Sequence, residues 1–274
     1  MSDLLRDMIA KRKEGIICGV PSYCTANELV IESVLKQAKR FDDSILIEAT
    51  ANQVNQFGGY TGMKPADYRE FVYEIADRIG FPRENVVLGG DHLGPLTWVD
   101  EDEASAMDKA EELVRLFVAA GYKKIHLDTS MRLASDPTDE MLSDETIAAR
   151  GARLYAACEE EYQKLLAKNP DEKRPVYIIG SEVPIPGGAQ EEEDSISVTK
   201  PAAVEKTLAA YKEQFEKVGM GDAFENIIGI VVQPGVEFGD DTVFHYNRVN
   251  AAELTAAMQK YDGVVMEGHS TDYQ

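Results

Sequence analysis

Three of the four histidines follow short apolar runs, at positions where a β-strand would end. They are His92, His126 and His269, in the segments GGDHLGP, KIHLDTS and MEGHSTD. Imidazole nitrogens bind zinc and other transition metals, and such an ion polarises a carbonyl as a Lewis acid. A strand-end histidine can instead be a purely hydrogen-bonded structural group, and this alternative applies most to His126, which lies deepest in its run. His245 lies outside the pattern, and we expect it at the surface.

Carboxylates occupy equivalent positions after the same kind of apolar run. The set is Glu48, Asp91, Asp128, Glu182, Glu237, Glu267 and Asp272. Parallel strands are buried on both faces, so a charged group at their ends needs a partner, a ligand or a metal to offset its desolvation. We therefore predict a divalent metal, zinc or another transition metal, held by His92, Glu182 and His269. Asp91 is the predicted acid/base, and Asp128 is a second predicted catalytic carboxylate.

A substrate that binds through oxygen atoms is the predicted ligand of this rim. The residues predicted to bind it are Glu48, Asn52, Gln53, Arg132, Gln233 and Glu237. Arg132 is the candidate contact for an anionic group in an otherwise acidic protein. The sequence contains neither GxxxxGK[ST] nor a GxGxxG after a strand, so P-loop kinase chemistry has no support. The glycine-rich loop 58–62 either offers backbone amides to a phosphate or is simply a turn.

The elements that must position these residues are seven Val/Ile/Leu-rich runs, each followed by a loop and a segment with helical apolar spacing. The runs are 15–20, 44–49, 85–89, 124–127, 176–180, 227–232 and 263–266. This alternation predicts an α/β fold, a TIM-type (β/α)8 barrel that lacks its last unit, as one domain over residues 1–274. Either the opening segment or a partner closes the sheet, or the sequence is a fragment that ends after its seventh strand.

Several helix signals accompany the predicted strands. The segment Thr25 to Glu28 has the form of a capping box, and Pro65 is placed to begin the next helix. Gly121 is placed to end the third helix. The segment 147–167 is predicted to be the longest helix.

Composition limits the classes of function. The chain has 274 residues, of which 44% are hydrophobic, as is typical of globular proteins. Its 28 basic and 49 acidic residues give a net charge of −21, which disfavours binding to nucleic acid or anionic lipid. The start has no apolar h-region and no run is long enough to cross a bilayer, so we expect a cytoplasmic protein without membrane contact. Cys18, Cys24 and Cys158 are expected to be reduced, mostly packing residues, with a reactive thiol as the alternative for Cys18 and Cys24.

Six rim segments resemble the GatZ/KbaZ family, the non-catalytic subunits of class II D-tagatose-1,6-bisphosphate aldolase. They are residues 48–63, 89–95, 124–132, 180–190, 232–240 and 267–274. The resemblance implies a TIM-type barrel and a role in the catabolism of galactitol, N-acetylgalactosamine or tagatose phosphate. Some members are described as ketose 6-phosphate 4-epimerases and older descriptions name tagatose-6-phosphate kinases. Members continue past the STDYQ motif, where this sequence stops.

Three functional hypotheses follow. The first is a metal-assisted, ketose 6-phosphate 4-epimerase-like activity on a tagatose-pathway sugar phosphate. The alternative is a non-catalytic subunit, part of an oligomer, that stabilises and activates a catalytic class II aldolase subunit. The third is a sugar-phosphate aldolase that acts alone.

Overall fold

The computed structural model describes residues 3–138, 142–181, 197–238, 243–261 and 263–268. The helices are α1 (Leu4–Lys13), α2 (Glu28–Phe41), α3 (Pro65–Ile79), α4 (Glu103–Ala119), α5 (Asp144–Lys168), α6 (Pro201–Lys217) and α7 (Ala252–Met258). The strands are β1 (Ser22–Cys24), β2 (Ile45–Thr50), β3 (Val86–Leu93), β4 (Lys124–Leu127), β5 (Val176–Ile179), β6 (Ile227–Val231), β7 (Glu237–Phe238), β8 (Val243–Phe244) and β9 (Val265–Glu267). Short 3₁₀ turns lie at Gly59–Thr61, Arg83–Asn85, Pro95–Trp98 and Ala223–Glu225.

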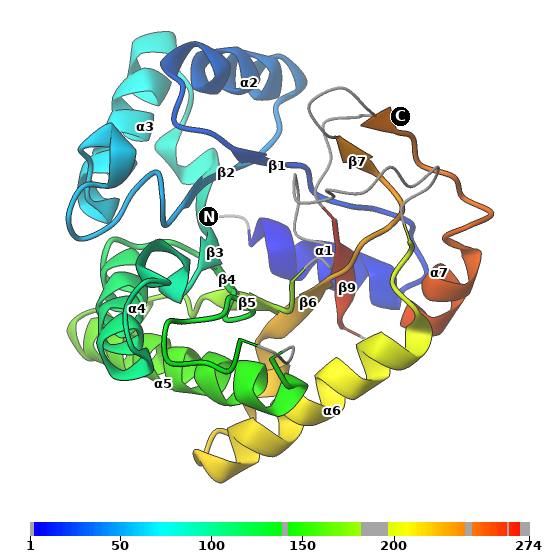
Figure 1. Ribbon diagram of the computed structural model, residues 1–274. Coiled ribbons are helices and arrows are strands. Elements are labelled where there is room, and N and C mark those ends of the chain that lie inside the picture. Colours follow the sequence, from blue (N-terminus) through cyan, green and yellow to red (C-terminus); the bar gives the residue numbers. More distant parts are fainter. Residues whose placement is uncertain (1–2, 139–141, 182–196, 239–242, 262, 269–274) are drawn as a thin grey trace.

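Seven parallel strands form one curled sheet in the order β1-β2-β3-β4-β5-β6-β9. Helices α2 to α7 lie around the outside of this sheet, so the strands enclose an interior (Figure 1). The predicted α/β class with helix-covered parallel strands is confirmed. Within the part of the chain that the structure describes, β1 and β9 are the two edges, and no backbone hydrogen bond joins them.

Side chains alternate between the two faces of the sheet, as the strand period requires. In β2, Ile45 and Ile47 face the helices and join the main core. Leu46 belongs to a second apolar cluster, inside the curl of the sheet, and Glu48 lines the same interior. The interior therefore carries an apolar layer near the strand beginnings and a charged layer nearer their ends.

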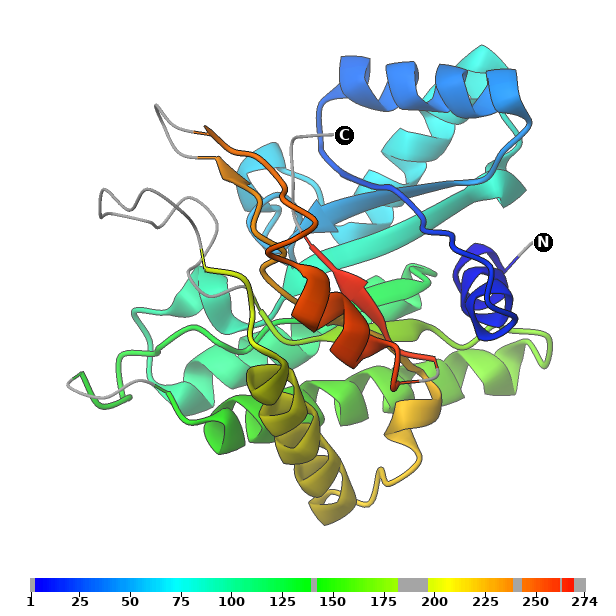
Figure 2. The ribbon, with the colours of Figure 1, turned by 90° about the vertical axis from the view of Figure 1, so that its right-hand side faces the viewer.

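The opening segment forms helix α1 rather than a strand that closes the sheet. Leu5, Met8 and Ile9 pack against Leu46 and other residues from the beginnings of the strands. Figure 2 shows α1 on the opposite side of the molecule from the β7–β8 hairpin. Its apolar face thus covers the base of the sheet and leaves the carboxyl ends of the strands open.

The first predicted strand, 15–20, is wrong. The sheet begins instead at β1, where Ser22 pairs with Leu46, and Ile17 is 98% exposed. The other six predicted runs overlap β2, β3, β4, β5, β6 and β9. Helix α2 is capped by Asn27, whose side chain accepts from the N–H groups of Leu29 and Val30, and not by Thr25.

The remaining helix signals agree with the structure. Pro65 begins α3, Gly121 follows the end of α4 in the left-handed region, and α5 is the longest helix described. Among the helices of the described residues, none combines the length and the apolar character that crossing a bilayer requires.

Candidate functional site

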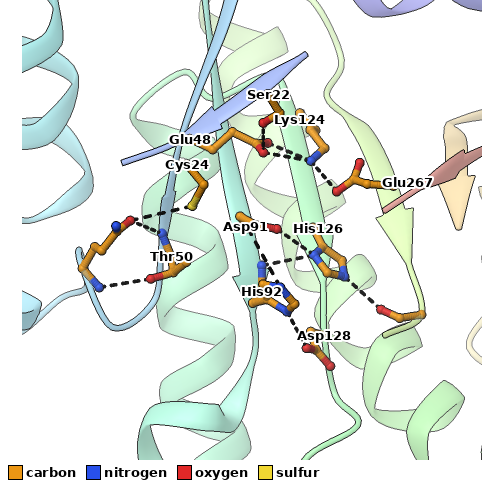
Figure 3. A network of polar contacts seen from close by, with 12 residues as sticks. Ser22, Cys24, Glu48, Thr50, Asp91, His92, Lys124, His126, Asp128 and Glu267 are labelled. Carbon is orange, nitrogen blue, oxygen red and sulfur yellow. Dashed lines mark hydrogen bonds and ion pairs between the residues drawn. The ribbon is translucent and has the colours of Figure 1, made fainter. Parts of the chain in front are cut away.

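The site is built around an irregularity at the end of β3. The register between β3 and β4 shifts between Gly90 and Leu93, and His92 adopts a left-handed backbone with φ of 47°. In a regular strand, neighbouring side chains point to opposite faces, and a bulge redirects one of them. The side chains of Asp91 and His92 both reach the same polar network (Figure 3).

Asp128, just beyond β4, orients the imidazole of His92. Its Oδ2 lies 2.8 Å from Nδ1 of His92, while Oδ1 accepts from the N–H and hydroxyl of Ser130 at 3.0 and 2.7 Å. Burial would raise the pKa of Asp128, but the bond to His92 and the nearby imidazoles lower it below its usual value. An ionised Asp128 fixes a proton on Nδ1 and leaves Nε2 of His92 as the acceptor or ligand atom.

His126 is completely buried between Asp91 and the end of β5. Its Nε2 donates to the carbonyl of Gly180 at 2.9 Å, and its Nδ1 lies 3.0 Å from Oδ1 of Asp91 and 3.2 Å from the backbone nitrogen of His92. Burial lowers the pKa of His126, but Asp91 outweighs it and the pKa is raised. The imidazolium donates to Asp91, whereas the neutral ring accepts from the N–H of His92.

A charged layer lies beneath this pair, deeper in the interior. Nζ of Lys124 is 2.8 Å from Oε1 of Glu48 and 2.7 Å from Oε1 of Glu267, and the hydroxyl of Ser22 donates to Oε2 of Glu48. Burial alone would lower the pKa of Lys124, but Glu48 and Glu267 raise it above its usual value. Lys124 is therefore a fixed ammonium and not a free-amine nucleophile.

A cavity of about 650 Å³ opens onto the charged layer and onto Asp91. Asp91, Glu48, Lys124 and Glu267 provide its polar wall, and Leu5 and other apolar residues line the rest. The exposed Cys24 stands at this wall, with Sγ 3.9 Å from Oε1 of Gln53. Surrounding protein displaces water from the Cys24 thiol and, with the charges of Asp91 and Glu48, raises its pKa, so the thiol stays protonated.

The structure brings together some of the predicted metal and catalytic residues. Asp91, His92 and His126 offer ligand atoms that all lie within 4.8 Å of one another. His126 is the weakest ligand of the three, because Nε2 is bound to Gly180. Glu182 and His269, the other two predicted metal ligands, lie outside the described residues, as does Asp272. The predicted ligand set therefore remains a prediction.

The predicted substrate-binding residues have differing surroundings. Glu48 lines the cavity but is paired with Lys124. Gln53 accepts from the N–H of Thr50 at 2.9 Å, and Asn52 accepts from Thr97 at 3.1 Å.

The other three predicted contacts lie on loops or on the hairpin. Gln233 is fully buried, and its side-chain oxygen accepts from the N–H groups of Gly235 and Val236, so it organises its own loop. Arg132 is half-buried on the loop after β4. Glu237 belongs to β7, and its side chain lies outside the described part. Substrate binding by these residues remains a prediction.

Sequence reasoning missed Ser22 and Lys124 and treated Cys24 as a packing residue. One signal for Lys124 was present, because a lysine at the start of the apolar run 124–127 must be buried in a parallel sheet and needs an acid partner. Its partners lie in β2 and β9, far away in sequence, and only the curled sheet identifies them.

Comparisons with known proteins match this chain to a single family. Residues 5–274 match the family model described as D-tagatose-1,6-bisphosphate aldolase subunit GatZ/KbaZ-like. The D-tagatose-1,6-bisphosphate aldolase subunit GatZ of Salmonella paratyphi B is 48% identical over 271 residues, which is 98% of this chain and 62% of that protein. The subunit of the same name from Klebsiella pneumoniae is 46% identical over 270 residues, with the same coverage.

Two solved structures share the fold. A protein of Sinorhizobium meliloti 1021, described as a probable tagatose 6 phosphate kinase, has a TM-score of 0.81 and 47% identity, over 94% of this chain and 60% of that one. A candidate fructose-1,6-bisphosphate aldolase of Coccidioides immitis has a TM-score of 0.55 and 13% identity, over 98% of this chain and 73% of that one. At that identity the second likeness shows the fold alone.

Proposed function

Because this chain belongs to the GatZ/KbaZ-like family of D-tagatose-1,6-bisphosphate aldolase subunits, we propose that it supports a catalytic class II aldolase subunit. The observation that carries the proposal is the 48% identity, across 98% of the chain, to a protein named as a subunit of that aldolase. The chain spans 62% of the length of that relative. Binding to a catalytic subunit and assembly into an oligomer are therefore proposals for this chain.

We also propose that the complete fold is a TIM-type barrel, in which an eighth unit lies between β9 and β1. The support is the topology: each consecutive strand of the curled sheet is added beside the preceding one, and both edge strands run parallel. The described residues pack on one main core, which favours a single domain.

Co-purification with a catalytic class II tagatose-1,6-bisphosphate aldolase subunit tests the subunit hypothesis. We expect a stable complex, faster release of triose phosphate from tagatose 1,6-bisphosphate and a longer half-life of the activity on warming. The His92→Ala variant should support the aldolase as well as the unchanged protein does. The absence of a complex together with an unchanged half-life would contradict the proposal. Triose phosphate release without a partner would favour an aldolase that acts alone.

A second candidate is the metal-assisted, ketose 6-phosphate 4-epimerase-like activity. The observation that favours it is the group of donor atoms on Asp91, His92 and His126. These imidazole and carboxylate donors suit zinc or another transition metal, and Nε2 of His92, oriented through Asp128, suits a ligand role. When bound, such an ion would act as a Lewis acid on the ketose carbonyl.

The chain's own residues would then handle the proton and the sugar. With His92 as the metal ligand, Asp91 would be the acid/base: it lies 3.0 Å from His126, which orients it, and would accept or return a proton at a carboxylate oxygen. Asp128 keeps His92 in one tautomer, so its role is positioning rather than proton transfer. Arg132 is the proposed contact for the phosphate. This reading applies whether the carbon–carbon bond is cleaved and rejoined or a proton is exchanged.

Interconversion of fructose 6-phosphate and tagatose 6-phosphate distinguishes the two candidates. The epimerase hypothesis requires conversion that disappears with a chelator and in His92→Ala. Asp128→Asn should weaken metal binding by roughly 10- to 100-fold, as loss of an outer-shell partner does. His245→Ala, which changes an exposed histidine, is the matched control. Conversion that persists in His92→Ala would rule out the proposed site.

A further inference from the structure

The two edge strands of the sheet are connected through the interior by side chains. Ser22 of β1 contacts Glu48 of β2, Glu48 contacts Lys124 of β4, and Lys124 contacts Glu267 of β9. This polar chain begins on one edge and ends on the other (Figure 3). The two strands have no backbone hydrogen bond to each other within the described residues.

The ion pairs of this polar chain are short, and their central members are shielded from water. The side chain of Lys124 is 2% exposed and that of Glu48 is 3% exposed, and the Lys124 contacts are 2.7 and 2.8 Å long. Buried ion pairs are weakly screened by salt, and removal of one member leaves an uncompensated buried charge. Substitution of Glu48 or Lys124 should therefore destabilise both β1 and β9.

The backbone of β3 makes room for the polar chain. Glu48 crosses over Gly89, whose added Cβ would overlap with the Glu48 carboxylate. The side chain thus reaches Lys124 by passing over a residue that has none. Both edge strands are short, three residues each, so each has few backbone bonds to its one neighbour.

We propose that Ser22, Glu48, Lys124 and Glu267 form a strut that holds β1 and β9 in place from inside the curled sheet. Interior strands are held on both sides by backbone hydrogen bonds. The strut holds each edge strand through side-chain contacts on the side that has no neighbouring strand. It is argued from contacts between side chains of this chain alone, so its test does not depend on either proposed function. Lys124 is its central member, since it alone contacts two carboxylates from separate strands.

Amide hydrogen exchange on the 274-residue chain tests the strut, with Glu267→Gln as the first variant. Glu267 is the most exposed of the three charged members, with 20% of its side chain exposed, so this variant is expected to fold. Residues 265–267 should exchange roughly tenfold faster or more, because a buried ion pair is lost, while residues 176–179 are unchanged. Equal exchange in 265–267 before and after the substitution would overturn the proposal.

Lys124→Met removes the centre of the strut, and Lys123→Met is its matched control. Lys123 is the preceding residue and pairs with Glu172 instead of the interior carboxylates. We expect faster exchange at both edges, residues 22–24 and 265–267, only in Lys124→Met. If Lys124→Met fails to fold, the triple variant Glu48→Gln, Lys124→Met, Glu267→Gln removes all three charges together. If the strut exists, the triple variant should fold, but the amides of residues 22–24 and 265–267 should still exchange fast. Exchange in these residues as slow as in the unchanged protein would refute the proposal.

Discussion

At the scale of single residues, the most unusual backbone lies in the candidate site. His92 has φ of 47° in a chain where Asp42 is the other described non-glycine residue with positive φ. A left-handed backbone costs a residue with a Cβ roughly 1–2 kcal/mol, and such strain is concentrated at functional sites. The bulge that imposes it delivers Asp91 and His92 to one network. The strain is therefore tied to the placement of these two side chains.

Comparing His92→Gly with His92→Ala measures this strain. Both variants lose the bond to Asp128, but glycine adopts positive φ freely. We expect His92→Gly to be more stable than His92→Ala by about 1 kcal/mol in chemical denaturation. Equal stability of the two variants would mean that the left-handed backbone carries no cost.

The sequence identified part of the site and missed Lys124, the central residue of its charged layer. Asp91 and His92 follow a buried apolar run, so the strand-end rule identified them, and the contact of His92 with Asp128 follows from neighbouring parallel strands. The bulge has no comparable sequence signal, because a register shift depends on tertiary pairing. Lys124 was missed because its partners Glu48 and Glu267 depend on the curl of the sheet.

At the scale of elements, a buried arginine anchors residues 128–138, the described segment that follows β4. Nη1 and Nη2 of Arg150 donate to Asp136 at 3.0 and 2.6 Å, and Nη2 also donates to Glu103 at 2.7 Å. The loop carries Asp128 at its start and Arg132 in its middle. Arg150 therefore holds in place the segment that carries the site's orienting carboxylate and its candidate phosphate contact.

The Asp136→Asn variant should show how much the contact between Arg150 and Asp136 contributes to the free energy of unfolding at each pH. The hydrogen bonds from Arg150 lower the pKa of Asp136 below 3.8, so its stabilising effect is complete above that pH and disappears as pH falls through the lowered value. We expect the variant to lose roughly 2–3 kcal/mol of unfolding free energy near neutral pH, since Glu103 still pairs with Arg150. The difference from the unchanged protein should shrink in acid. A difference that stays constant from pH 7 to pH 3 would contradict this account.

Elements with a strong apolar period were predictable, and the two-residue strands were not. The run 124–127 coincides with β4, and Pro65 marked the start of α3 correctly. The apolar run 15–20 was wrongly predicted to be a strand. Pairing with β2 begins only after it, at Ser22, and Ile17 faces solvent. The two-residue strands of the β7–β8 hairpin are too short for a period-two pattern to appear.

At the scale of the whole molecule, the described residues form a sheet that is curled but open between β1 and β9. Cavity-lining residues include the consecutive stretches 18–25 on the β1 side and 265–268 on the β9 side. Consecutive lining residues indicate that the strand edges themselves form walls, because side chains facing an interior would alternate. Unpaired edges of this kind are also sites where further strands add.

A longer chain of this family that supplies an eighth strand should close the opening. We expect slower amide exchange in residues 22–24 and 265–267 than in the 274-residue chain, because both edges would gain backbone partners. Exchange by mass spectrometry on both lengths measures this. Identical protection in the two chains would contradict an eighth strand at this position.

The contact between Gly89 and Glu48 has an evolutionary consequence. Any side chain at position 89 would occupy the space through which the acid at position 48 passes. We expect the two positions to change together among related sequences, a bulkier residue at one accompanying a shorter one at the other. In the laboratory, the damage from Gly89→Ala should be partly repaired by Glu48→Ala, a non-additivity that marks the two as one inherited unit.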